Sequence, residues 1–216
     1  MSVNPFVPVE EAAPPEEVEL RDAVFGDRTV LDGPPSPATA PPVAGEVVEW
    51  PLVEAATSSG LMVMGLHGGA GTSLVTSLLA HVEHSEMPWE AHDVGTAWPV
   101  AGGWARPRPP LNVVAVYRPH RAGVEAAERF ARTWAKSALP DSQLLGIVAV
   151  DDGPKLLEAQ KQAVRRIARM TPHGWHVPWN EEWRVAEPAF DAVPRRIRKT
   201  LRSIRKTVEE EGVHND

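Results

Sequence analysis

A glycine-rich segment between an apolar run and a helix-like stretch is the part of the sequence best suited to chemistry. It covers residues 66–73 and reads Leu-His-Gly-Gly-Ala-Gly-Thr-Ser. Glycines let a backbone approach a ligand closely, and the first turn of a helix offers unpaired N–H groups to an anion. The segment therefore indicates a phosphate-binding site. A tight turn between a strand and a helix, without any ligand, is the alternative interpretation.

The spacing of the glycines distinguishes between two phosphate-binding motifs. It does not fit G-x-G-x-x-G, so a dinucleotide site of that type is not expected. It does fit a P-loop with substitutions, because Thr72 occupies the lysine position and Leu66 replaces a frequent first glycine. Ser73 matches the serine or threonine that binds Mg²⁺ in this motif.

In this register the segment resembles the deviant P-loop of the ParA/MinD partitioning and septum-site ATPases, which reads K-G-G-x-G-K-[ST]. His67 stands at the position of that family's signature lysine. The resemblance continues, in order, over residues 60–190. Residues 113–119 look like the family's later core strand, and residues 145–152 are similar to the strand whose terminal asparagine reads the base. Residues 176–181 look like the segment that lines the base pocket.

The resemblance implies a P-loop NTPase-like fold and a set of candidate binding residues. Nucleotide contacts are expected from His67, Gly68, Gly69, Ala70, Gly71, Thr72, Ser73, Asp152, Pro178 and Trp179. Mg²⁺ contacts are expected from Ser73 and, through an earlier strand, from Asp93. The glycine segment together with Trp98-Pro99, Pro178-Trp179 and Trp183-Arg184 also resembles an uncharacterised family of actinobacterial P-loop-like proteins, which implies no particular biochemistry.

The missing lysines decide the expected mechanism. In a P-loop the lysine reaches the β- and γ-phosphates, and its charge stabilises the transition state. Thr72 supplies no charge, His67 carries little charge at pH 7, and the first lysine of the chain is Lys136. Arg118, Arg121 or an arginine of a second subunit are the remaining sources of charge. Because losing a transition-state charge costs about 10²-fold or more in rate, hydrolysis is expected to be poor or absent.

Three functions stay open at this point. The first is a ParA/MinD-like P-loop protein that binds nucleotide weakly, with ATP and Mg²⁺ as cofactors, and acts in regulation or assembly. The second is a non-enzymatic interaction module that keeps the fold but binds no nucleotide. The third is an ATPase that an arginine completes in trans, in a homodimer. No catalytic residue is identified by the sequence.

Two aspartates and three tryptophans near the ends of later strands each have two interpretations. Asp151 and Asp152 precede a glycine and a proline, which suits a turn with a helix N-cap, or a contact to a base or Mg²⁺. Trp175, Trp179 and Trp183 suit core packing or a loop contact, since tryptophan buries a large area. Stacking of Trp179 on a base is the alternative.

The last helix-like segment combines an apolar seam with a basic surface. The seam consists of residues at 4-3-4 spacing: Ile197, Leu201, Ile204 and Val208. The basic residues are Arg195, Arg196, Arg198, Lys199, Arg202, Arg205 and Lys206. This pattern favours a helix docked on a sheet with a solvated basic face. The alternatives are an unidentified protein partner, nucleic acid, an anionic membrane surface, or the chain's own acidic tail.

Strand-like and helix-like segments alternate along the chain. Strands are expected at 46–50, 61–65, 91–94, 111–117, 144–150 and 175–177, and helices at 72–84, 122–138, 154–170 and 195–211. This alternation predicts an α/β fold, a mainly parallel sheet with helices on both faces. In such sheets ligands bind beyond the carboxyl ends of the strands, where the glycine segment lies.

The charge of the 216-residue chain is unevenly placed. Residues 1–46 hold nine acidic and two basic side chains, so the net charge of −7 lies there. Their proline content predicts a disordered tail over 1–45, followed by a P-loop-like domain over 46–194 and the basic helix and tail over 195–216. The absence of cysteine excludes disulfides and thiolate catalysis. No apolar run has the length of a membrane span, so a cytoplasmic protein is expected.

Overall fold

A six-stranded sheet forms the centre of the protein, in a computed structural model that describes residues 24–45, 49–57, 59–80, 90–104, 106, 108, 110–186, 188 and 193–212. The strands are ordered β1-β8-β7-β6-β3-β4. Their bounds are β1 (Val30–Asp32), β3 (Leu61–Gly65), β4 (Ala91–Asp93), β6 (Asn112–Tyr117), β7 (Gln143–Val150) and β8 (His173–Val177). Every neighbouring pair is parallel except β1 with β8.

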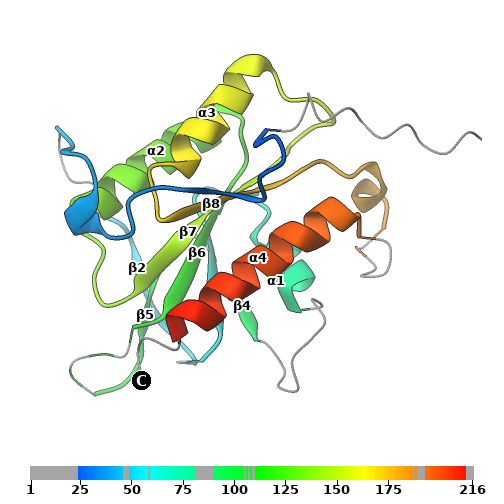
Figure 1. Ribbon diagram of the computed structural model, residues 1–216. Helices are drawn as coiled ribbons and strands as arrows, with labels where there is room; N and C mark the ends of the chain where they lie inside the picture. Colours follow the sequence, from blue (N-terminus) through cyan, green and yellow to red (C-terminus); the bar gives the residue numbers. More distant parts are fainter. Residues whose placement is uncertain are drawn as a thin grey trace, which may run out of the picture.

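Helices cover both faces of this sheet (Figure 1). In the described chain they are α1 (Thr72–Ala80), α2 (Arg121–Ala135), α3 (Glu158–Ala168) and α4 (Arg195–Gly212). Phe130 of α2 and Ile167 of α3 belong to one apolar cluster, whereas Val75 of α1 and Leu201 of α4 belong to the other. The predicted α/β fold with a mainly parallel sheet and helices on both faces is therefore confirmed.

The central strands are apolar along nearly their whole length because both of their faces are covered. In β3, Met62 and Met64 enter the cluster under α2 and α3, while Leu61 and Val63 enter the cluster under α1 and α4. β3 is thereby held rigidly between the two layers. It delivers the glycine-rich segment to the carboxyl end of the sheet.

Residues 24–45, which the sequence analysis assigns to a disordered tail, include side chains that pack into the core. Val24, Phe25 and Leu31 are 2%, 8% and 4% exposed and belong to the core cluster under α2 and α3. Leu31 lies in β1, which pairs with β8 and covers its outer edge. The prediction of disorder over 1–45 is wrong for residues 24–45, because a short apolar stretch gains burial from a sheet edge that composition does not register. Residues 1–23 lie outside the described residues.

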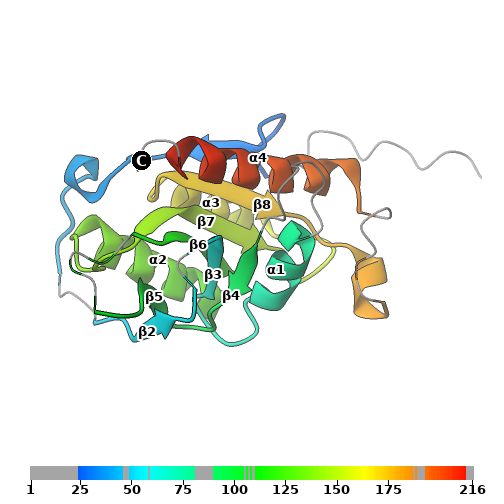
Figure 2. The ribbon, with the colours of Figure 1, turned by 90° about the horizontal axis from the view of Figure 1, so that it is seen from below.

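A second, two-stranded sheet was not predicted. β2 (Leu52–Ala55) pairs in parallel with β5 (Trp98–Ala101), and neither stretch is among the strands expected from the sequence. Trp98 is 0% exposed and donates its Nε1–H to the carbonyl of Pro140 at 2.8 Å. Figure 2 shows this pair on the side of the main sheet away from α4. Of the strand expected at 46–50, residues 46–48 lie outside the described residues and residues 49–50 are not in a strand.

The helix ends also differ from the expected ones. α3 begins at Glu158 and not at Pro154, because Gln160 Oε1 accepts the backbone N–H of Leu157 at 2.9 Å and closes the first turn there. The described part of α1 ends at Ala80, and residues 81–89 lie outside the described residues. The apolar seam of α4 is buried against the sheet as expected, so residues 195–212 pack as part of the same domain.

Candidate functional site

The glycine-rich loop joins β3 to α1 and depends on two glycines. Gly69 and Gly71 have φ values of +74° and +95°, a region that residues with a side chain rarely adopt. Ala70 between them is 1% exposed and anchors the loop to the cluster under α1. The first backbone bond of α1 runs from the N–H of Val75 to the carbonyl of Gly71 at 3.0 Å. The N–H groups of the first turn, before Val75, therefore have no acceptor within the helix.

The two residues predicted to bind Mg²⁺ lie in contact. Ser73 Oγ donates to Asp93 Oδ2 at 2.8 Å, and the other carboxylate oxygen, Oδ1, accepts the N–H of Gly95 at 3.0 Å. Asp93 reaches this place because β4 is parallel to β3, with Asp93 opposite Val63. Among the described residues no group of three or more histidine, cysteine or acidic side chains could hold a metal by itself.

His67 is a structural connection between the loop and β6. Its Nε2 accepts the backbone N–H of Arg118 at 3.1 Å, so the ring proton is on Nδ1, which donates to the carbonyl of Gly68 at 2.9 Å. A Cβ at Gly123 would lie 2.9 Å from this Nε2, so glycine there leaves room for the ring. Both ring nitrogens are occupied in the neutral imidazole. His67 therefore does not act as a substitute for a charged lysine in this arrangement.

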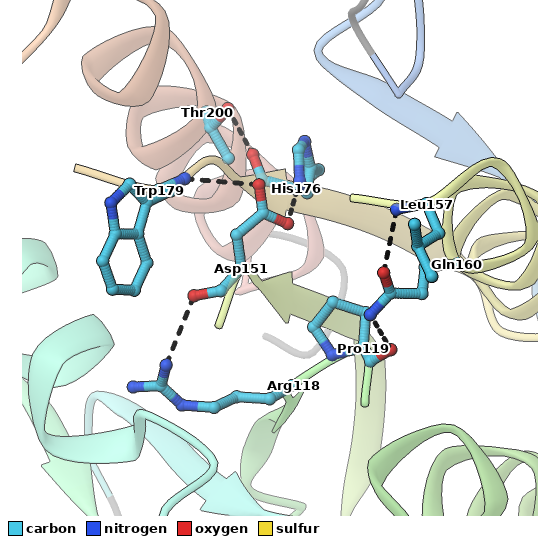
Figure 3. Close-up of polar contacts among 8 residues, drawn as sticks. All are labelled: Arg118, Pro119, Asp151, Leu157, Gln160, His176, Trp179 and Thr200. Atoms are coloured by element: carbon cyan, nitrogen blue, oxygen red, sulfur yellow. Dashed lines mark hydrogen bonds and ion pairs between the residues drawn. The ribbon is translucent and has the colours of Figure 1, made fainter. Parts of the chain in front are cut away.

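Arg118 brings the positive charge to the loop. Its Nε donates to the carbonyl of Gly69 at 2.8 Å and its Nη1 donates to the carbonyl of Asp151 at 3.3 Å (Figure 3). Arg121, the other candidate from the sequence, is 93% exposed and pairs with Glu125 at 3.0 Å on α2. Of the two arginines, Arg118 is the one that the fold places at the glycine-rich loop.

Asp151 holds the loops that follow β7 and β8 together. Its Oδ1 accepts from His176 Nε2 at 2.8 Å, and its Oδ2 accepts the backbone N–H of Trp179 at 3.3 Å (Figure 3). The side chains of Asp151 and His176 are only 9% and 5% exposed. The N-cap interpretation of Asp151 is wrong, because α3 starts seven residues later at Glu158. Asp152 lies next to this network, and none of the described hydrogen bonds involves its side chain.

The polar network continues to α3. Gln160 Nε2 donates to the carbonyl of Pro119 at 3.0 Å, which ties the loop after β6 to the first turn of α3. Beneath it, burial raises the pKa of Tyr117 far above its usual value, and the charge of Asp151 acts in the same direction. Neither Tyr117 Oη nor His176 Nδ1 has a hydrogen-bond partner, although both atoms are buried.

The tryptophans after β8 have different roles. Trp175 is 1% exposed and donates its Nε1–H to Ser203 Oγ of α4 at 3.2 Å, so it is a core residue. Trp183, in the 3-10 helix η3 (Glu181–Arg184), packs partly buried against the same cluster. Trp179 follows Pro178 at the rim and donates its Nε1–H to Glu181 at 2.7 Å. This bond and one from Arg184 lower the pKa of Glu181.

The fold thus joins loops that are distant in sequence. Arg118 connects the glycine-rich loop to Asp151, and Asp151 connects to Trp179, so the loops after β3, β6, β7 and β8 form one hydrogen-bonded network. The Asp151–His176 pair was missed by the sequence interpretation. The only signal was that Asp151 directly follows β7 and His176 is the penultimate residue of β8, so that alternation places both side chains on the same face of the sheet.

The seven basic residues of α4 differ in exposure, and one of them, Arg198, is half-buried. Arg195, Arg196, Lys199, Arg202 and Lys206 are exposed, and we call them the basic stripe. Arg205 is 5% exposed and pairs with Glu209 at 2.8 Å, so it belongs to the packed side of the helix. The stripe is available to an anionic partner, whereas Arg205 is not.

These features define an α/β domain with a glycine-rich loop at the carboxyl end of a parallel sheet. The chain belongs to a family of unknown function, DUF6668, whose model matches residues 59–201. That range runs from the start of β3 into α4 and contains the whole network described above. No curated protein and no solved structure matches the chain. Within the described residues, no helix is long and apolar enough to cross a membrane.

Proposed function

We propose that this protein is a ParA/MinD-like P-loop protein that binds nucleotide weakly at residues 66–73. The observation that carries the proposal is the 2.8 Å hydrogen bond between Ser73 Oγ and Asp93 Oδ2. In P-loop NTPases, the hydroxyl after the lysine position and an aspartate of another strand hold Mg²⁺ together. The same two residue types meet here beside a glycine-rich loop and a helix N-terminus, which supports a magnesium–nucleotide site.

The phosphates would lie against the backbone of the loop. The positive φ values of Gly69 and Gly71 shape this backbone, and the dipole of α1 adds partial positive charge at Thr72 and Ser73. Trp179 at the rim offers an indole face to a base, with Pro178 and Asp152 as neighbours. The ligand class is therefore a nucleoside triphosphate with its divalent cation.

Hydrolysis is expected to be slow or absent. Thr72 carries no charge, and both nitrogens of His67 are engaged with the backbone. An essential transition-state charge is thus missing from the lysine position, a loss of about 10²-fold or more in rate. Binding without turnover suits a regulatory or assembly role, in which occupancy of the site and not hydrolysis carries the signal.

Calorimetry with Mg-ATP and Mg-GTP on the full chain tests this function. The variant Thr72→Lys should bind roughly tenfold to a hundredfold more tightly than the wild type, because it gains a charge-assisted contact to phosphate. Ser73→Ala should lose the Mg²⁺-dependent part of the affinity. The measurement gives both the nucleotide preference and the contribution of the cation.

The matched control is Ala80→Lys, which adds the same charge to the exposed last residue of the same helix. That position is about 12 Å along the helix from Thr72, too far for a direct contact to the loop. Ala70 is unsuitable as a control because it is buried. Equal and negligible binding by the wild type, Thr72→Lys and Ala80→Lys, all folded, would exclude a nucleotide site.

A second candidate is an interaction module without nucleotide. It is favoured by the self-contained hydrogen bonding of the loop, since Ser73, His67 and Arg118 all find partners within the protein. The basic stripe of α4 would then be the surface for an anionic partner. An ATPase completed in trans is the third candidate, and turnover per chain that rises with protein concentration would identify it.

A further inference from the structure

The guanidinium of Arg118 is a cation without a carboxylate partner, held at the glycine-rich loop. Its two described acceptors are neutral backbone carbonyls, those of Gly69 at 2.8 Å and Asp151 at 3.3 Å. A guanidinium carries five N–H donors in a planar fork, so donors remain for a ligand. Within the described residues, no ion pair involves this arginine.

Two carboxylates near the loops are engaged elsewhere, and no described hydrogen bond or ion pair joins Asp152 to Arg118. Both oxygens of Asp93 are used by Ser73 and Gly95, and both oxygens of Asp151 are used by His176 and Trp179. Only the main-chain oxygen of Asp151 faces Arg118, which Figure 3 shows plainly. Within the described residues, the guanidinium of Arg118 is therefore in contact with no carboxylate, and it lies beside a helix N-terminus, which carries partial positive charge. An anion would balance both.

The backbone of Arg118 is fixed while its side chain is held only by neutral contacts. His67 accepts the N–H of Arg118 at 3.1 Å, and the next residue, Pro119, accepts from Gln160 at 3.0 Å. The guanidinium can move from a carbonyl to a neighbouring ligand by side-chain rotation alone. Phosphate oxygens carry negative charge and accept a guanidinium bidentately, whereas the present acceptors are neutral carbonyls, so the exchange is favourable.

We propose that Arg118 is the phosphate-recognising cation of this site. It supplies the positive charge that Thr72, at the lysine position of the motif, lacks. On binding, its guanidinium leaves the carbonyl of Gly69 for phosphate oxygens of the nucleotide. The inference rests on the proposed nucleotide site and names the residue that supplies its charge. Because the arginine fork contacts two oxygens at once, lysine at this position is a poor replacement.

Calorimetry with Mg-ATP and with inorganic triphosphate on the full chain tests the role of Arg118. We expect Arg118→Gln to weaken both ligands by roughly tenfold to a hundredfold, and Arg118→Lys to fall between Gln and the wild type. The control is Arg121→Gln, which removes a nearby exposed arginine and should stay within about twofold. Adding Thr72→Lys to Arg118→Gln should restore much of the affinity, because it returns a positive charge to the site.

A second measurement uses the wild-type chain and is independent of variant folding. In ¹⁵N-arginine spectra, the Nε–H signal of Arg118 should shift with added Mg-ATP and saturate with the calorimetric affinity. Nucleotide binding that leaves this signal unmoved, or that is equal in Arg118→Gln and the wild type, would overturn the role of Arg118 and leave the nucleotide site standing. Absence of binding by both the wild type and Thr72→Lys would overturn the site and this role together.

Discussion

At the scale of single residues, the loops are held by side chains that satisfy several backbone groups at once. His67 links the glycine-rich loop to the backbone after β6, and Asp151 links His176 to the backbone after β8. Of these bonds, the one between Asp151 and His176 is buried, and a buried bond costs much to leave unmade because the remaining partner keeps its desolvation penalty. The pair of Asp151 and His176 is accordingly the polar contact whose loss should matter most for stability.

Replacing Asp151 by asparagine tests this directly. The substitution keeps the size of the side chain but removes the charge from two hydrogen bonds, at an expected cost of about 1–3 kcal/mol in the free energy of unfolding. The neighbouring change Asp152→Asn, at a partly exposed side chain, should stay within about 0.5 kcal/mol. Urea denaturation of the three proteins gives both values, and equal stabilities would show that the Asp151–His176 pair is dispensable.

At the scale of elements, β1 closes one edge of the sheet. It pairs antiparallel with β8 over three residues, and Arg165 of α3 donates to the carbonyl of Val24, six residues before the strand begins. The same strand β8 carries His176 and leads to Trp179. Residues 24–32 therefore support the outer side of the site as well as the core.

Leu31→Ala should destabilise the protein by about 2–5 kcal/mol, because it removes a buried side chain from a packed cluster. Asp27→Ala, at an exposed position of the same segment, serves as the control and should be close to neutral. Thermal or urea unfolding followed by near-UV circular dichroism measures both. If Leu31→Ala were as stable as the wild type, the packing of this segment against the core would contribute nothing measurable to stability.

α4 illustrates how one helix serves packing and surface charge together. Its seam is buried on the sheet, and Arg205 extends the packed side through its pair with Glu209. Contacts to nucleic acid, membrane or an acidic protein, if made by this helix, belong to the basic stripe alone. Such contacts would weaken steeply with salt.

At the scale of the whole molecule, the site lies where parallel strands end and four loops meet. Ligands of open α/β sheets bind in this position because backbone groups and helix N-termini converge there. Charge for transition-state stabilisation is nevertheless sparse, since residues 66–73 contain no lysine or arginine and, among the described hydrogen bonds, Arg118 is the cation that contacts this loop. An arginine from a second copy of the chain is the remaining source of charge.

We therefore expect ATP turnover per chain to stay at the level of Ser73→Ala at every protein concentration. Ser73→Ala removes the hydroxyl next to Asp93 and defines the background. A coupled phosphate-release assay from low to high protein concentration measures this. Turnover that exceeds the background and rises with concentration would instead favour a homodimeric ATPase completed in trans.

Local patterns in the sequence predicted most of the element types and the position of the glycine-rich loop between a strand and a helix. Apolar runs and helical periodicity predicted β3, β6, β7, α1, α2 and α4 closely, because those signals arise within a few residues of one another. The parallel order of strands then placed Ser73 and Asp93 at the same end of the sheet. The two side chains are in contact in the structure, and their binding of Mg²⁺ stays a prediction.

Only the tertiary structure decided which distant residues meet. The burial of Val24, Phe25 and Leu31, the pairing of β2 with β5, and the choice of Arg118 over Arg121 depend on contacts across the sheet that no local window contains. Asp151 likewise became the residue that holds the loops, in place of the expected N-cap, because His176 and Trp179 approach it from another strand. Hydrogen-bond partners are set by position in space, and sequence spacing records only separation along the chain.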